Sequence, residues 1–264
     1  MLTLFRRIRK SLLSSGSVKK YTLYAIGEIA LVVIGILIAL QINNWNQSRL
    51  DRIEEQKILV AISKDVNRIK YWCDLCASSS QAVLKGSTQL LNVVHSDDQD
   101  YPEVQREQDL ARIFERCLVG TGLAENIYDV LKSSDQLELI TSRELRNELS
   151  NLDSQLGTMI AFERLQNDFM DNQLKPLVNQ FIDRTQLNYK MVGYEIAIDT
   201  SEFDKRFKSD YQGLNEQREF SNLLVDFMIH TNEIIDLYRL IHESTGIIDS
   251  LLYEELPPIN MESK

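Results

Sequence analysis

A run of twenty residues, 21–40, constrains this chain more than any other feature. It contains one charged residue, Glu28, and every charge in the segment before it is positive. In a helix that rises about 1.5 Å per residue, twenty residues cover about 30 Å, the thickness of a bilayer's hydrocarbon core. Trp45 follows the run where an interfacial aromatic anchor would sit. We therefore predict a transmembrane helix over 21–42.

Charge predicts the orientation of this helix. Six basic residues and no acidic ones precede it, which by the positive-inside rule holds the segment 1–20 in the cytoplasm: Arg6, Arg7, Arg9, Lys10, Lys19 and Lys20. We expect an exterior domain over 43–256 and a tail over 257–264. The formal net charge is -10, so the chain without these six residues carries -16. Such an acidic surface favours solubility and argues against nucleic acid or anionic lipid as a partner.

A removable signal peptide is the alternative interpretation of the apolar run. The region ahead of the run is long for a signal peptide, and the run exceeds the usual signal core. The bulky Leu37 stands two residues before Ala39, where a cleavage site needs a small residue. We therefore predict an uncleaved anchor. Before it, Phe5, Ile8 and Leu12 share one face of a basic segment suited to the membrane interface.

Two segments of the chain resemble a family of uncharacterised bacterial membrane proteins. The first has the sequence YAIGEIALVVIGILIALQINNWN and covers Tyr24 to Asn46; the second begins at Tyr128-Asp-Val-Leu-Lys-Ser-Ser134 and continues with Leu137, Leu139-Ile140 and Glu144-Leu-Arg146. Together they resemble domain of unknown function 6090. The resemblance implies a bacterial single-pass membrane protein over nearly the whole chain. With the orientation predicted from charge, we expect a protein of the bacterial inner membrane whose N-terminus is cytoplasmic and whose C-terminal domain is periplasmic. That family has no established activity, so it implies no functional residues.

Beyond the span, apolar residues recur at alternating spacings of three and four, which is typical of long helices. The first seam consists of Leu59, Ile62, Val66, Ile69, Cys73, Cys76, Val83, Leu90 and Val94. We expect the transmembrane helix to run straight into it. The acidic stretch 97–102 ends this helix, with Asp100 as the N-cap and Pro102 early in the next helix, which extends to about Leu118.

Two more long helices are predicted downstream. Thr141 and Glu144 form a capping box for a helix whose seam is Leu145, Leu149, Leu152, Leu156 and Met159. Pro176 should kink or end that helix, and the stretch 185–215 shows no clear period. The longest seam comes last and consists of Phe220, Leu224, Phe227, Thr231, Ile234, Tyr238, Ile241, Thr245, Ile248 and Leu252.

These seams predict an all-α fold, in which the N-terminal transmembrane helix continues into an exterior antiparallel bundle of long helices. Strict alternation of threes and fours suits coiled-coil-like, left-handed packing. Four prolines and ten glycines in 264 residues leave little turn chemistry for a sheet protein. An exterior domain of about 220 residues is large enough to bury its own core, so no second domain is required.

Cys73 and Cys76 form a CxxC pair in a compartment that we expect to be oxidising. Both lie on the apolar seam in mid-helix, whereas reactive CxxC pairs usually lie at a helix N-terminus that stabilises the thiolate. Buried packing is therefore the favoured interpretation. A structural disulfide, either with or without Cys117, is one alternative, and redox or metal chemistry is another.

The other candidates for chemistry lack partners in the sequence. His242-Glu243 begins like a zinc-protease motif, but Gly246 stands where the second histidine is needed, so His242 is predicted to face solvent. His95 and His230 have no companion at ligand spacing. A calcium loop would need a glycine and a terminal glutamate that do not accompany Asp97, Asp98 and Asp100. We predict no catalytic residue, cofactor or metal.

Glu28 is the strongest candidate for a functional residue in the span. It lies seven residues into the apolar run, about 10 Å deep, where a charged carboxylate costs about 1 to 3 kcal/mol. Gly35 and Ala39 share its helical face and form a small-xxx-small pair that permits close helix approach. The alternative is that Glu28 extends toward the cytoplasmic headgroups and contacts no other helix.

Two function classes remain after these exclusions. The first is a membrane-anchored, non-catalytic interaction module, an assembly factor or sensory partner, that binds another envelope protein or a second copy through the span or the bundle. The second is a periplasmic small-ligand receptor or enzyme with a pocket between helices. About twenty cytoplasmic residues are too few for a kinase or cyclase, so signalling would need a separate output protein. We favour the first class.

Overall fold

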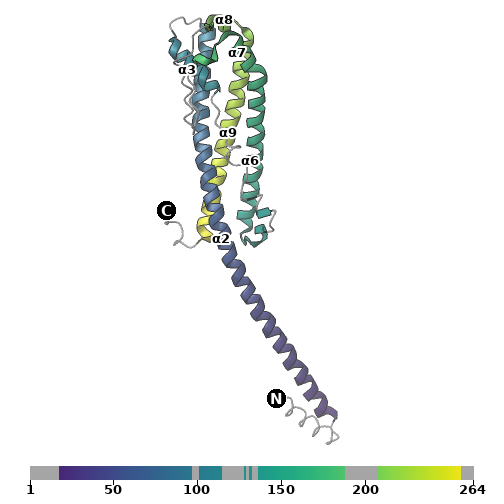
Figure 1. The fold of residues 1–264 in the computed structure, drawn as a ribbon. Coiled ribbons are helices and arrows are strands. Elements are labelled where there is room, and N and C mark those ends of the chain that lie inside the picture. The colour runs from purple at the N-terminus through teal and green to yellow at the C-terminus, as the bar shows by residue number, and fades with distance from the viewer. Residues whose placement is uncertain are drawn as a thin grey trace. The chain divides into compact units, whose positions relative to one another are not determined.

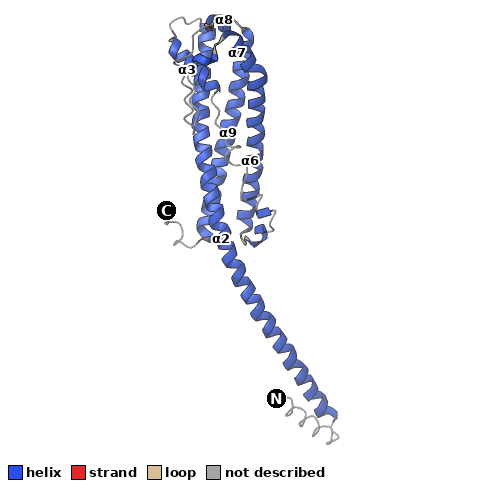
Figure 2. Cartoon of the chain, viewed as in Figure 1, coloured by secondary structure: helices blue, strands red, loops and turns tan. Residues whose placement is uncertain are grey.

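The structure, a computed structural model, is all-α over the residues that it describes (Figure 2). These residues are 18–96, 101–114, 128, 131–132, 136–187 and 207–256. The described elements are helices, without strands, as the sequence predicted. The chain divides into two compact units, Met1–Gln56 and Lys57–Lys264, which are described in turn.

The first unit contains the N-terminal part of helix α2 (Val18–Ser96). Its apolar side chains point outward all round the helix, with Leu31 69 % and Leu40 53 % exposed. The segment beginning at Ala25 is long and apolar enough to cross a membrane by length and composition, and none of its most apolar window is buried. The prediction that the apolar run continues without a break into the first seam is confirmed, because α2 contains both.

The second unit is a bundle of three long helices, with η1 (Gln136–Leu139) at the end where α6 (Arg143–Phe169) begins and the other short elements at the opposite end (Figure 1). The long helices are residues 57–96 of α2, helix α6 and helix α9 (Arg218–Glu255). The shorter elements are α3 (Glu103–Phe114), η1 (Gln136–Leu139), η2 (Met170–Leu174), α7 (Lys175–Phe181), η3 (Arg184–Gln186) and α8 (Tyr211–Asn215).

Polar contacts between the helices fix their directions. Along α2 and α9, Lys70 pairs with Asp249 at 3.8 Å and His95 bonds Ser221 at 3.1 Å. The residue numbers rise on α2 as they fall on α9, so these helices are antiparallel. Helix α6 is antiparallel to α9 as well. Tyr238 of α9 donates a hydrogen bond to Glu163 of α6, and Gln166 of α6 donates one to Thr231 of α9. It follows that α2 and α6 run in the same direction and α9 runs against both.

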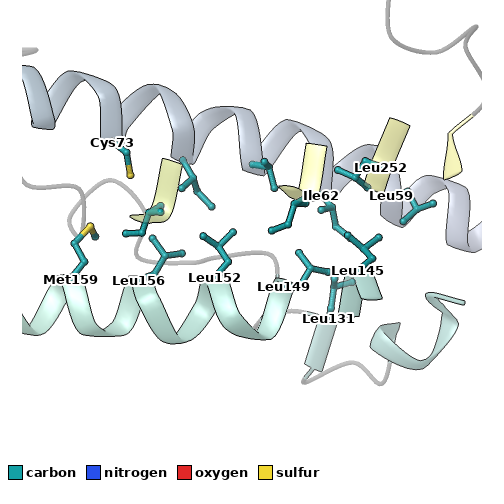
Figure 3. Close-up of a cluster of buried hydrophobic side chains, with 14 of the residues drawn as sticks. Leu59, Ile62, Cys73, Leu131, Leu145, Leu149, Leu152, Leu156, Met159 and Leu252 are labelled. Carbon is teal, nitrogen blue, oxygen red and sulfur yellow. The ribbon is translucent and has the colours of Figure 1, made fainter. Parts of the chain in front are cut away.

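The predicted seams form the main core of this bundle. In Figure 3, side chains of α2 such as Ile62 and Cys73 face side chains of α6 such as Leu149 and Met159. Every predicted seam residue of α6 and of α9 is buried. On α2 the same holds for all but one, since Val94 is half-buried and its neighbour Val93 takes the buried position. The spacing of threes and fours therefore identified the core.

A second apolar cluster lies among the shorter elements. It joins Val83 and Leu90 of α2 to residues of α3, α7 and α8 and to the first turns of α9. Its side chains are more often aromatic than those of the main core, with Phe114, Phe169, Tyr211, Phe220 and Phe227. Short helices are marginally stable in isolation, so packing against this cluster is what holds them.

The ends of the helices differ from the predictions in one detail and agree in another. The N-cap of α6 is Ser142, whose hydroxyl accepts from the backbone N–H of Leu145 at 3.2 Å, so the capping box that begins at Thr141 is wrong by one residue. The predicted interruption near Pro176 is seen as a change of helix type: α6 ends at Phe169, the chain continues as the π-turn η2, and Pro176 lies in the first turn of α7. Asp100, Leu118 and the stretch 188–206 lie outside the described residues.

Candidate functional site

The span residues singled out from the sequence lie on the exposed surface of the first unit. Glu28 is half-buried, Ala39 and Trp45 are exposed, and a Cβ atom added to Gly35 would have no neighbour within 4 Å. Helical spacing puts Glu28, Gly35 and Ala39 on one face. A shallow apolar hollow adjoins this face and is lined by Ala25, Glu28, Ile29, Val32 and Val33. Among the described residues, this face has room for another helix.

Within the bundle, the most unusual feature is a buried carboxylate. Glu163 of α6 is 4 % exposed, and its Oε1 accepts a hydrogen bond of 2.9 Å from the hydroxyl of Tyr238 on α9. Burial, reinforced by the carboxylate of Glu163, raises the pKa of Tyr238 above its ordinary value. The phenol therefore stays neutral and keeps the proton that it donates.

Cys73 of α2 completes this layer, which we call the Glu163 layer and define as Cys73, Glu163 and Tyr238. The thiol is buried, and burial together with the charges of Asp74 and Glu163 raises its pKa to about 12. The three side chains come from the three long helices. A protonated thiol is a poor nucleophile, so this layer suits positioning of the helices better than catalysis.

A second polar contact lies one turn further along α6. The side-chain amide of Gln166 donates to Oγ1 of Thr231 at 2.8 Å, and that hydroxyl donates to the backbone carbonyl of Phe227 at 2.8 Å. The Tyr238–Glu163 bond and the Gln166–Thr231 bond both join α6 to α9 inside an apolar interior. Sliding one helix past the other would leave buried polar atoms without partners, so these bonds favour one register.

The two cysteines of the CxxC pair have different states. Cys73 is a free, buried thiol, as the packing interpretation predicted. Cys76 is also buried, but it is disulfide-bonded, so for this residue the packing interpretation is wrong and the disulfide alternative applies. The third cysteine of the chain, Cys117, lies outside the described residues. The sequence pattern could not separate these states, because both residues occupy the same seam.

The histidines lie at the surface or boundary of the bundle. The side chain of His242 is 44 % exposed, and its Nδ1 lies 2.8 Å from Oδ1 of Asp74, so the predicted solvent-facing position is confirmed. His95 is exposed and bonds Ser221. The ring of His230 lies edge-on to that of Phe169, with 5.2 Å between their centroids. Each of these contacts joins two segments of the bundle.

Asp109 of α3 is a second buried carboxylate. It is 0 % exposed and accepts hydrogen bonds from Tyr101, from Gln105 at 3.1 Å and from Arg112 at 3.1 Å. On the opposite side lies Gly86 of α2, where an added Cβ atom would come within 3.0 Å of the Oδ1 atom of Asp109. The carboxylate is thus enclosed by donors of its own segment and by a helix that approaches closely because it carries a glycine there.

Arg106 lies between two aromatic rings beside this cluster. Its guanidinium carbon is 5.9 Å from the ring centre of Tyr101 and 5.6 Å from that of Tyr211. Burial and the charge of nearby Glu107 raise the pKa of Tyr211 to about 12. Cation–aromatic contacts of this kind stabilise the packing of α8 on α3. Arg184 makes a similar contact with Phe114 at 4.3 Å.

No group of three or more His, Cys, Asp or Glu side chains within the described residues could hold a metal ion. The candidate cation ligands Asp97, Asp98 and Asp100 lie outside the described residues. The shallow hollow beside Glu28 is apolar and open, and its described lining carries one ionisable group, Glu28. The described arrangement therefore offers helix-packing surfaces and buried polar contacts as its distinctive features.

Glu163 and Asp109 were missed in the sequence, although a signal for Glu163 was present. Position 163 continues the α6 seam four residues after Met159, so a glutamate there is a charge on the face predicted to be buried. Asp109 precedes the apolar pair Leu110-Ala111 on a short helix. A short helix gives too few turns to identify its buried face by periodicity.

No model of a protein family, no curated protein and no solved structure matches the chain. The resemblance to domain of unknown function 6090 therefore stays a prediction.

Proposed function

We propose that this chain is a membrane-anchored, non-catalytic interaction module of the bacterial cell envelope that serves as an assembly factor or sensory partner. The observation that carries the proposal is that α2 contains both an apolar segment long enough to span a bilayer and a main seam of the bundle core. The buried polar contacts of the bundle join helices to one another, which suits a rigid binding surface rather than a reactive centre.

The proposed location of the bundle is the periplasm, with the N-terminus in the cytoplasm. The six basic residues before the span support this orientation through the positive-inside rule. The disulfide at Cys76 supports it independently, because such bonds form and persist in oxidising compartments and are rare in the cytosol.

Reporter fusions test this location and orientation. A reporter that is active only outside the cytoplasm should work when it is fused after Asn46 and fail when it is fused after Lys20. The reverse pattern would refute the orientation. Because a cleaved signal sequence would also export the first fusion, an epitope placed at the N-terminus must stay with the full-length protein in the membrane fraction.

The face of Glu28, Gly35 and Ala39 is the proposed contact for a partner helix, either another envelope protein or a second copy. Small residues allow close approach of helix backbones, and a carboxyl or amide can hydrogen-bond across the contact. In a two-hybrid assay for transmembrane segments, Gly35→Leu and Glu28→Leu should weaken association, whereas Glu28→Gln should largely preserve it.

Ala30 supplies a matched control for this assay. It is a small, exposed residue of the same helix, and its spacing from Gly35 places it on the opposite face. Ala30→Leu should therefore leave association unchanged, and membrane insertion is measured separately for every variant. Equal association by all variants would show that the face contacts lipid and that Glu28 extends to the headgroups.

Cross-linking followed by purification of the full chain separates this proposal from a ligand receptor or enzyme. A partner protein recovered in a fixed ratio supports the interaction module. A small molecule that co-purifies with the bundle and raises its thermal stability would favour the receptor or enzyme instead.

A further inference from the structure

Helix α9 carries a second apolar row on the face turned away from the bundle core. We call it the outer row, and its four members are 40 % to 52 % exposed: Val225, Ile229, Leu240 and Ile247. Their separations of four, eleven and seven residues are close to one, three and two turns of 3.6 residues, so they share one face. Leu240 follows the buried Tyr238 by two residues, which places it about 200° round the helix. None of the four belongs to either apolar cluster of the described bundle.

The exposed residues of the other two long helices are mainly polar. Within residues 57–96 of α2 the one large apolar side chain that is exposed is Tyr71, and within α6 it is Leu165. Single apolar residues are common on protein surfaces, whereas a row of them on one face indicates a contact surface. Val and Ile are also weaker helix formers than Ala, Leu or Glu, so helix formation does not account for them at exposed positions.

Acidic residues fill the gaps in the outer row. Asp236 lies seven residues after Ile229, and Glu243 lies three residues after Leu240, so both continue the row at helical spacing. Arg239 pairs with Asp236 at 2.9 Å. The exposed charged residues of α9 are mostly acidic: Glu219, Asp226, Glu233, Asp236, Glu243 and Glu254, with Arg218 and Arg239 as the basic ones. The outer face of α9 therefore combines aliphatic side chains with negative charge.

We propose that the outer row and its acidic neighbours bind an amphipathic helix of another envelope protein, with Lys or Arg between the apolar residues of its contacting face. This inference rests on the proposed interaction module and names the surface that the bundle uses. Rows of residues spaced by threes and fours pack between those of a second helix. Charge complementarity selects the occupant, because basic side chains opposite Asp236 and Glu243 would form ion pairs. A second copy of this chain would instead bring the same acidic surface to the contact.

Photo-crosslinking of the full chain in its own cells tests this surface. The photoreactive residue benzoylphenylalanine is placed at position 229, 240 or 247, one position at a time, and at position 165 of α6 as the matched exposed control. Positions 229, 240 and 247 should cross-link to one and the same protein, and position 165 should not. Mass spectrometry of the cross-linked peptide should identify a segment with apolar residues at helical spacing and Lys or Arg between them.

Two substitutions separate the apolar contribution from the charged one. Leu240→Asp should lower the cross-linking yield from position 229 at least about tenfold, because it removes an apolar contact. Leu165→Asp is its control on α6 and should leave the yield unchanged. Glu243→Lys should lower the yield at least about threefold by repelling a basic partner, and Asp168→Lys, at an exposed position of α6, is the matched control. Circular dichroism of the purified variants checks that they retain their helix content.

Three results would overturn the proposal: equal cross-linking from position 165 and the outer row, cross-links to a second copy or to lipid alone, or a yield that Glu243→Lys leaves unchanged. The outcome for this surface is distinguishable from that for the interaction module. A partner recovered in a fixed ratio by chemical cross-linking, without cross-links from positions 229, 240 and 247, would refute this surface alone. The absence of any fixed-ratio partner would refute both.

Discussion

Helix α2 contains two stretches that are equally helical and have opposite side-chain environments. Over residues 25–42 the apolar side chains surround the helix and are exposed, with Ile36 at 56 %. Over residues 57–96 they are confined to one seam and buried, with Ile62 at 0 %. The two stretches differ in how apolar residues are distributed around the helix: on all sides in the first stretch and along one side in the second. Apolar residues all round suit a bilayer, whereas a seam requires other helices of the same chain.

The largest expected difference between the two stretches comes from shortening one isoleucine in each. Ile62→Ala should lower the free energy of unfolding of the bundle by about 3 to 4 kcal/mol, because it removes buried methyl groups and leaves a cavity. Ile36→Ala should leave that free energy unchanged. Urea unfolding of the full chain in detergent, followed by circular dichroism, measures both. An equal effect of the two substitutions would contradict the division of α2 into these stretches.

Substitutions of polar groups provide a second comparison of the bundle with the span. Tyr238→Phe removes one hydrogen bond to the buried Glu163 and should lower the free energy of unfolding by about 1 to 2 kcal/mol. Glu28→Gln changes a polar group in the span and should not alter bundle unfolding. The phenylalanine keeps the ring in place, so a loss near zero would show that Tyr238 contributes mainly by packing rather than through its hydrogen bond.

Glycines on the long helices test close approach. Alanine usually stabilises an exposed helix position by about 0.5 to 1 kcal/mol relative to glycine. Gly157→Ala on α6 should show this gain, since an added Cβ has no neighbour within 4 Å. Gly86→Ala should lower the free energy of unfolding by about 1 kcal/mol. The added Cβ would press on Asp109, and the hydrogen bonds to Asp109 prevent that side chain from moving away. A gain at both positions would show that Asp109 can shift.

The smallest effect is expected at the surface pair of His242 and Asp74. Both side chains are largely exposed, 44 % and 58 %, so solvent screens their interaction. His242→Ala should change the free energy of unfolding by less than about 0.5 kcal/mol. A loss above 1 kcal/mol would mean that this pair, rather than the core seams, contributes substantially to the packing of α9 on α2.

Much of the fold could be predicted from the sequence because long helices repeat their signal over many turns. The seam of α9 was complete from Phe220 to Leu252, and the regular helix α6 gives way to the π-turn η2 just before Pro176, which lacks a backbone N–H. Local chemistry was less decisive at single residues. Thr141 and Ser142 are both good caps, and only the backbone path shows that Ser142 accepts from Leu145.

The candidate site depended on tertiary structure to a greater degree. Glu163 and Tyr238 are 75 residues apart in the sequence, and nothing local to either one indicates the other. Asp109 is enclosed because α2 carries glycine at the point where α3 packs against it. Cys73 and Cys76 have the same spacing, face and burial, yet one is free and the other is bonded.

The sequence by itself determined the apolar span, the all-α class and the faces of the long helices, because each follows from the order of apolar and polar residues along one segment. Only the tertiary structure decided the register of the three helices, the pairing of Glu163 with Tyr238, the enclosure of Asp109 by α2 and the different states of Cys73 and Cys76. These depend on distances between segments far apart in the chain. Burial then makes the difference energetically important, because a buried polar group or charge without a partner is costly.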